Sequence, residues 1–127
     1  MADIEYTHWI IFPTTRLRVE IDVRHGQVQR FVVQLEYDVN WRFDETGPHD
    51  WKPVARFDHD PAGEFGHDIE REGLHLDVYR SERKERVERG FPRVPVNQAP
   101  GWCEDYLVRE AKRYVNQFER WHGLRGP

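Results

Sequence analysis

The chain of 127 residues contains a single cysteine, Cys103, so no disulfide can form within it. One unpaired cysteine is typical of proteins from a reducing compartment. No apolar run approaches the roughly 20 residues that a membrane-spanning helix needs. The first residues, Met-Ala-Asp-Ile-Glu, lack the charged and apolar regions of a signal peptide. We therefore expect a cytoplasmic protein that does not associate with membranes.

The chain also lacks an excess of positive charge. Its 23 acidic and 19 basic residues give a formal net charge of -4. Proteins that bind along a duplex usually carry a clearly basic face, so the overall charge disfavours that class. The sequence contains no P-loop, dinucleotide-binding fingerprint, nucleophile elbow or cysteine-based zinc motif, which excludes most familiar enzyme classes.

Aromatic residues, by contrast, are abundant. They make up 13% of the chain, with five Trp, five Tyr and seven Phe, while all apolar residues together reach only 38%. Large rings therefore supply core volume that aliphatic side chains would otherwise provide. The length suits one domain, and no repeat or shift in composition divides it. We predict a single domain over residues 1–127.

Two segments in the first half alternate apolar and charged residues, which is typical of strands with one buried face. The apolar positions are Leu17, Val19, Ile21 and Val23 in the first segment, and Phe31, Val33, Leu35 and Tyr37 in the second. His25-Gly26 lies between them, and glycine tolerates the positive φ of a tight turn. This pattern predicts a hairpin whose second strand runs from Gln27 to Val39.

Further strands are predicted along the chain. Trp9–Phe12 is expected to pair at one edge, and Trp51–His59 to follow a turn at residues 44–50. After a glycine-containing loop at residues 60–66, His67–Glu70 and Leu74–Tyr79 are expected as two short strands. The expected faces of the strand at 51–59 are Ala55 and Phe57 on one side, and Val54, Arg56 and Asp58 on the other. Ser81–Arg89 is nearly all charged, which suits an exposed ribbon or a short helix.

A long amphipathic helix is predicted at the C-terminus. Asn97 is a good N-cap residue, and Pro100 suits the first turn. Apolar residues recur every three or four positions. They are Cys103, Leu107, Ala111, Tyr114, Phe118 and Trp121. We therefore predict an α+β fold in which a mostly antiparallel sheet packs on one long C-terminal helix, with Tyr6, His8 and Trp9 also in the core.

The segment that follows Trp51 holds the main functional candidates. Arg56, Asp58 and His59 end one strand, and His67 follows the loop. Three interpretations remain open. Arg56 and His67 could act on RNA, with His67 moving protons and Arg56 stabilising phosphate charge. His59, His67 and a carboxylate such as Asp58 could hold a metal. Alternatively, Arg56 and Asp58 form an ion pair within the sheet, and His67 caps the loop.

Other charged groups have simpler interpretations. His75 and Asp77 alternate with apolar residues, so we expect them on a solvated strand face. Glutamates separate the basic residues of the 80–93 segment, which favours a surface paired with itself. The spacing of the His and Asp residues between Asp58 and Asp77 matches no closed structural zinc site. We therefore expect neither a cofactor nor a stoichiometric transition metal.

Five pieces, in this order, resemble a family of archaeal and bacterial proteins with a domain of unknown function. They are Phe31–Glu36, Trp51–Asp58, Phe65–His67, Arg83–Arg86 and a terminal helix that begins near Asn97. The pattern of an arginine, an aromatic residue and an aspartate, followed by a loop and a histidine, is more distantly similar to TumE-like proteins. Those proteins are the toxin halves of two-gene toxin–antitoxin modules.

The resemblance implies a link to RNA or translation and a cognate antitoxin protein as partner. The residues that match the pattern are Arg56, Asp58 and His67, and only these carry over as candidate catalytic residues. Arg56 would bind phosphate, His67 would move protons, and Asp58 would orient one of them. The sequence thus leads to an RNA-directed, metal-independent, toxin–antitoxin-associated protein, with a non-catalytic binding or regulatory domain as the alternative.

Overall fold

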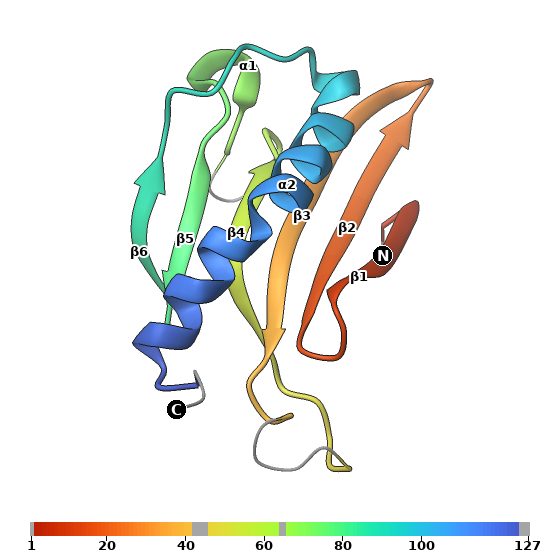
Figure 1. Cartoon of the computed structure of the whole chain (residues 1–127). Coiled ribbons are helices and arrows are strands. Elements are labelled where there is room, and N and C mark those ends of the chain that lie inside the picture. Colours follow the sequence, from red (N-terminus) through yellow and green to blue (C-terminus); the bar gives the residue numbers. More distant parts are fainter. Residues whose placement is uncertain (1, 42–45, 64–65, 125–127) are drawn as a thin grey trace.

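A computed structural model describes residues 2–41, 46–63 and 66–124 of the chain. Its centre is a six-stranded antiparallel sheet in which each strand pairs with the next in sequence (Figure 1). The strands are β1 (Ile4–Ile11), β2 (Thr15–Arg24), β3 (Gln27–Asp38), β4 (Trp51–His59), β5 (Leu76–Arg80) and β6 (Arg83–Glu88). The helical elements are α1 (Ile69–Glu72), the 3₁₀ turn η1 (Val96–Gln98) and α2 (Ala99–Trp121). This is the predicted α+β architecture.

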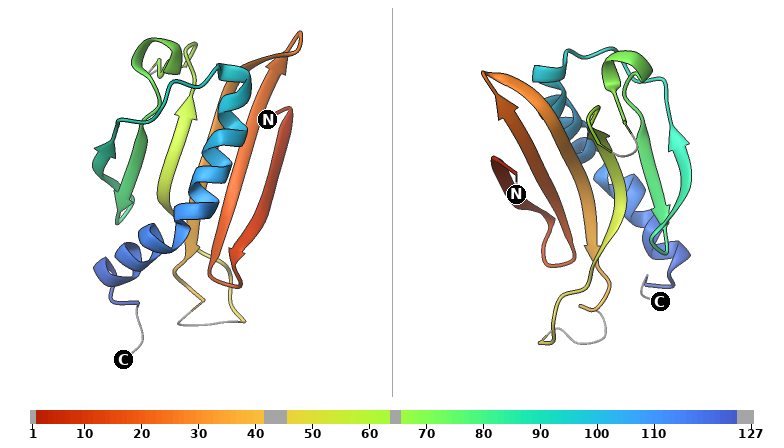
Figure 2. Two further views of the ribbon diagram at one scale, coloured as in Figure 1. Left: turned by 45° about the horizontal axis from the view of Figure 1, so that its top comes forward. Right: turned by 180° about the vertical axis from the view of Figure 1, so that it is seen from behind.

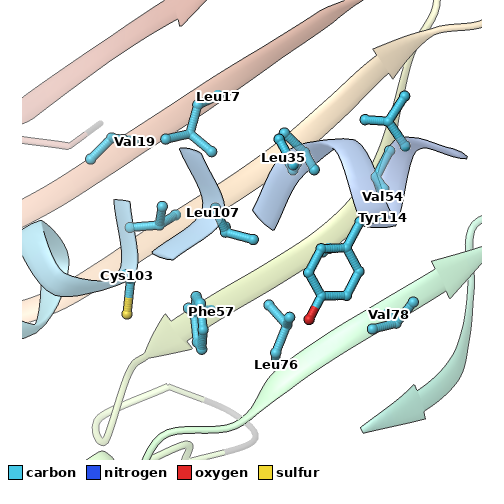
Figure 3. Packing of buried hydrophobic residues seen from close by; sticks show 14 of the residues in the cluster. Leu17, Val19, Leu35, Val54, Phe57, Leu76, Val78, Cys103, Leu107 and Tyr114 are labelled. Atoms are coloured by element: carbon cyan, nitrogen blue, oxygen red, sulfur yellow. The ribbon is translucent and has the colours of Figure 1, made fainter. Parts of the chain in front are cut away.

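The long helix α2 crosses one face of the sheet, and the view from behind shows the opposite face with no helix over it (Figures 1 and 2). Between sheet and helix lies the hydrophobic core (Figure 3). Leu17 and Leu35 from the hairpin, Phe57 from β4 and Leu107 from α2 are all fully buried there. No helix in the described part of the chain is both long and apolar enough to cross a membrane.

The predicted hairpin is confirmed. β2 pairs with β3 in antiparallel register, with Leu17 opposite Leu35 and Val19 opposite Val33. The turn lies at His25-Gly26, where His25 has φ 54° and Gly26 has φ 73°. The strand predicted at Trp51–His59 is also found with those bounds. The predicted turns at residues 44–50 and 60–66 fall partly outside the described residues.

The N-terminal strand differs from its prediction. It is longer than Trp9–Phe12, beginning at Ile4, and it forms the edge of the sheet. Tyr6 and Trp9 are exposed and His8 only half-buried, so the prediction that these three residues lie in the core is wrong. Tyr6 and His8 lie at the edge of the sheet, where Glu104 of α2 accepts a hydrogen bond from the Tyr6 hydroxyl at 2.6 Å and lies 3.0 Å from Nε2 of His8. Trp9 lies opposite Arg16 and therefore points to the face away from α2.

The segment after the loop also differs. Residues predicted as the strand His67–Glu70 instead include the one-turn helix α1, because Asp68 acts as an N-cap and accepts a hydrogen bond from the Glu70 amide at 2.9 Å. The exposed segment predicted over Ser81–Arg89 contains a strand, β6, and is therefore a ribbon and not a helix.

Two smaller predictions are corrected. Val54 is buried in the core instead of sharing a face with Arg56, because the β3–β4 register shifts between Leu35 and Glu36. Asn97 lies in η1 and does not cap α2. Its side-chain oxygen accepts a hydrogen bond from the Val28 amide at 2.8 Å and so ties the start of the helix to the hairpin.

The buried stripe of α2 generates the first prediction. Phe118 is 1% exposed and its ring lies 5.4 Å from that of Tyr37. Phe118→Ala should lower the free energy of unfolding by about 3–5 kcal/mol, because it removes a large aromatic side chain from a packed core. Chemical denaturation gives the value. Val108→Ala, on the exposed side of the same helix, is the control and should change stability by less than about 0.5 kcal/mol. A loss below about 1 kcal/mol for Phe118→Ala would contradict this packing.

Candidate functional site

The candidate residues lie on the face of the sheet that α2 leaves uncovered. Antiparallel pairing sets Gln34 of β3 opposite Arg56 of β4, and Arg56 opposite Asp77 of β5. The same register, extended by two residues on each strand, brings Asp58 level with His75. Polar side chains that are distant in sequence therefore lie side by side across three strands.

Asp58 is the centre of the predicted trio. Its Oδ2 accepts a hydrogen bond from Nε of Arg56 at 3.1 Å, and its Oδ1 lies 3.1 Å from Nδ1 of His67. His67 reaches this position because the chain returns beside the end of β4, where the Asp60 amide donates to the His67 carbonyl at 2.7 Å. The structure thus places Arg56, Asp58 and His67 together, on one face of the sheet. Their catalytic role stays a prediction.

A hollow of about 140 Å³ opens beside the trio. Arg56, Asp58 and His67 all line it, together with Arg30 of β3 and Asp60. The guanidinium of Arg30 lies 3.9 Å from an oxygen of Asp60, a long contact with a carboxylate that is itself exposed. Two guanidinium groups, two carboxylates and one imidazole therefore face a space that is several times larger than the roughly 30 Å³ of a water molecule.

The trio belongs to a longer polar network. Arg56 Nη1 donates to Oε1 of Gln34 at 3.5 Å, and Nε2 of Gln34 donates to Glu36 at 2.6 Å. Glu36 in turn accepts hydrogen bonds from Arg16 and Arg18 of β2, at 2.9 and 3.0 Å. This chain of contacts orients the Arg56 side chain from the side opposite Asp58.

His75 and Asp77 are buried, which contradicts the prediction of a solvated strand face. Only 6% of His75 and 2% of Asp77 are exposed. The His75 ring lies 5.1 Å from that of His67, and Lys84 of β6 reaches Asp77 at 3.3 Å. Among the described residues, Nδ1 of His75 and Oδ1 of Asp77 are the buried side-chain atoms without a hydrogen-bond partner. Alternation alone could not reveal this burial.

Two other candidates are set apart from this site. His59 stacks on Phe31 in the interior, and its Nδ1 accepts a hydrogen bond from the Ile69 amide at 3.1 Å. Burial lowers the pKa of His59, which keeps the ring neutral. Cys103 lies on the buried side of α2, and burial raises the pKa of its thiol, so it is not poised as a nucleophile.

The basic residues of the 80–93 segment are partly paired with acids, as predicted. Arg86 lies 2.9 Å from Glu88 on the same strand, and Lys84 contacts Asp77. The hydroxyl of Tyr114 from α2 also donates to Glu88, at 2.5 Å. Burial raises the pKa of Tyr114, and this hydrogen bond raises it further. These contacts tie β6 to the sheet and the helix.

Residues 1–124 match the model of a domain of unknown function, DUF7718. The chain belongs to the DUF7718 family. This agrees with the expected resemblance to a domain of unknown function, while the similarity to TumE-like proteins and an archaeal or bacterial origin stay predictions. No curated protein and no solved structure was found to match the chain.

Sequence reasoning missed several members of the site in this DUF7718 domain. They are Arg30, Gln34 and His75. Arg30 and Gln34 lie on a correctly predicted strand, and the β3–β4 register would have placed them beside β4. His75 could have been found only by knowing that β4 pairs with β5 in the observed register.

Asp58 is expected to couple energetically to His67. In a double-mutant cycle, the free energy of unfolding lost by the variant with both Asp58→Ala and His67→Ala is compared with the sum of the losses of the two single variants. The two values should differ by at least about 0.5 kcal/mol, because the residues share a direct contact. Urea denaturation of the four proteins gives the coupling. The control cycle pairs Asp58→Ala with His49→Ala, whose ring contacts Asp38 at the other end of β3. If both cycles are additive to within about 0.3 kcal/mol, the contact has no energetic role.

Proposed function

We propose that this DUF7718 domain is a small cytoplasmic, TumE-like, toxin–antitoxin-associated protein that acts on RNA, with a cognate antitoxin protein as its partner. The observation that carries the proposal is the arrangement of Arg56, Asp58 and His67 around one hollow. The resemblance to TumE-like proteins supplies the biological setting, and the site supplies the chemistry.

The contact between His67 and Asp58 suits proton transfer. A carboxylate next to one imidazole nitrogen fixes the orientation of the ring and stabilises its protonated form. Asp58 occupies this position toward Nδ1 of His67, at 3.1 Å. His67 is therefore the proton-transferring residue of the proposal, and Asp58 is the residue that positions it.

The arginines suit phosphate binding. A guanidinium presents several N–H donors in a planar fork that matches phosphate oxygens. Arg56 donates hydrogen bonds to Asp58 and Gln34. Arg30 lines the same hollow, and its guanidinium lies 3.9 Å from Asp60. Arg30 also donates hydrogen bonds to Asp22 at 3.4 Å and to Glu20 at 3.3 Å, so an incoming phosphate would compete with these carboxylates and with Asp60. Arg56 stays oriented by its two partners.

The proposed reaction is cleavage of a phosphodiester by the neighbouring 2′-hydroxyl. His67 takes the hydroxyl proton, the 2′ oxygen forms a bond to phosphorus, and the bond from phosphorus to the 5′ oxygen breaks. His67 then gives the proton to the leaving 5′ oxygen, so that a 2′,3′-cyclic phosphate and a 5′-hydroxyl result. Arg56 stabilises the charge that develops on phosphorus. The step uses only side chains of this chain and needs no metal.

Regulated expression in a bacterial host and an RNA cleavage assay with a chelator present test the proposal together. Wild-type protein should inhibit growth and cleave RNA to products with cyclic phosphate ends. His67→Ala should lower cleavage by at least about 100-fold, because general acid–base catalysis contributes about 10²–10⁴.

The matched control is His25→Asn, at the exposed hairpin turn, where asparagine tolerates the positive φ of 54°. This variant should keep full activity. Melting temperatures of both variants should stay close to that of the wild type. Equal cleavage by wild type and His67→Ala, or no cleavage by the wild type, would rule out the catalytic proposal.

A second candidate function, a non-catalytic RNA-binding or regulatory domain, is favoured by the aromatic residues of the uncovered face. Trp9 is 48% and Phe12 73% exposed, and their rings lie 5.0 Å apart. The guanidinium of Arg16 lies 4.0 Å above the ring of Trp51, which neighbours Trp9 at 5.8 Å. Exposed rings beside arginines are typical of surfaces on which unpaired bases stack.

Trp9→Ala tests this surface. It should weaken the binding of single-stranded RNA by about 5- to 160-fold, since the stacking of one base contributes about 1–3 kcal/mol. Fluorescence anisotropy with a labelled oligonucleotide gives the affinity. Val108→Ala, on the exposed side of α2, should bind as the wild type does. RNA binding without cleavage would favour this second function, and unchanged binding by Trp9→Ala would exclude the aromatic surface.

A further inference from the structure

The uncovered face contains a group that the proposed function does not use. His75 is 6% exposed, its Nδ1 has no hydrogen-bond partner among the described residues, and its ring lies beside that of His67. A buried polar atom without a partner destabilises the folded state. Such a group in a native structure calls for an explanation, and an ion that binds there is one.

The position of His75 relative to the trio supplies that explanation. One ring nitrogen of His75, one of His67 and one carboxylate oxygen of Asp58 all lie within 4.8 Å of one another. Two tetrahedral ligands, each about 2.0–2.1 Å from a zinc ion, lie about 3.3 Å apart. Nδ1 of His67 and Oδ1 of Asp58 already lie 3.1 Å apart. A small rotation of His75 toward this pair completes a three-ligand set.

We propose that Asp58, His67 and His75 form a binding site for one divalent transition-metal ion, such as zinc, at the end of β4. The set differs from the one considered from sequence, because His59 points into the core and His75 takes its place. The proposal also departs from the expectation, made from the sequence, that the chain holds no stoichiometric transition metal.

The ligand types select the class of ion. Two imidazoles and one carboxylate suit zinc and neighbouring transition metals, whereas calcium and magnesium prefer oxygen ligands. Three protein ligands leave a further coordination position for water or a ligand atom.

The bound ion would also regulate the proposed RNA cleavage, a consequence that rests on the proposed function. A metal ion on Nδ1 of His67 takes Asp58 away from its hydrogen bond to the ring and leaves the ring proton on Nε2, so the imidazole can no longer accept a proton from the 2′-hydroxyl. Zinc should therefore inhibit cleavage, and a chelator should restore it. Metal binding itself does not depend on RNA, so the two proposals can fail separately.

The test uses the full chain without an affinity tag, stripped with a chelator and dialysed. Titration with zinc chloride, followed by calorimetry, should show one ion per chain. Asp58→Asn, His67→Ala and His75→Ala should each weaken zinc binding by at least about 10-fold, whereas His25→Asn should bind as the wild type does. Replacement by Co²⁺ should give the visible absorption of a low-symmetry site in the wild type and not in His67→Ala.

Protein stability gives a second measurement, because His75→Ala changes a buried position. Zinc at 100 times its dissociation constant adds about 2.7 kcal/mol to folding stability, so it should raise the melting temperature of the wild type. It should not do so for His67→Ala, whose side chain is partly exposed. Binding of less than about one ion per chain, or equal zinc affinity in all three ligand variants and the wild type, would overturn the proposal.

Discussion

The structure depends on one imbalance: a six-stranded sheet has two faces, and a single long helix covers only one of them. Side chains of a strand alternate between the faces, so the burial of Leu17, Leu35 and Phe57 under α2 sends their neighbours to the other side. In the described chain those neighbours are mostly charged. These side chains form hydrogen bonds and ion pairs with one another, because α2 lies on the opposite face of the sheet.

The antiparallel register decides which of these neighbours meet. Gln34, Arg56 and Asp77 stand in line across β3, β4 and β5, and Asp58 lies one step further along. The loop after β4 then returns His67 to Asp58 through the backbone contact with Asp60. The site is therefore formed by strand pairing together with one short return of the chain. The core-facing residues of the same strands anchor these strands against α2.

The sequence correctly predicted those elements whose residues repeat with the period of a strand or a helix. The hairpin at His25-Gly26, β4 and the stripe of α2 follow from alternation or from helical spacing, and Arg56 and Asp58 share a face for the same reason. Patterns failed where contacts between distant segments decide the outcome. Asn97 binds the hairpin and not its own helix, and His75 is buried where alternation predicted a solvated face.

The balance of charge around the hollow bears on both proposals. Arg56 is held by Asp58, and Arg30 by Glu20, Asp22 and Asp60, so an anionic ligand must compete with these carboxylates. A cation meets the opposite situation, since the Asp58 carboxylate and the imidazoles of His67 and His75 offer it lone pairs within 4.8 Å of one another. The two proposals thus assign phosphate to the arginines and a metal to the histidines of one site. Asp58 takes part in both arrangements, so occupancy by one ligand changes the site that the other one meets.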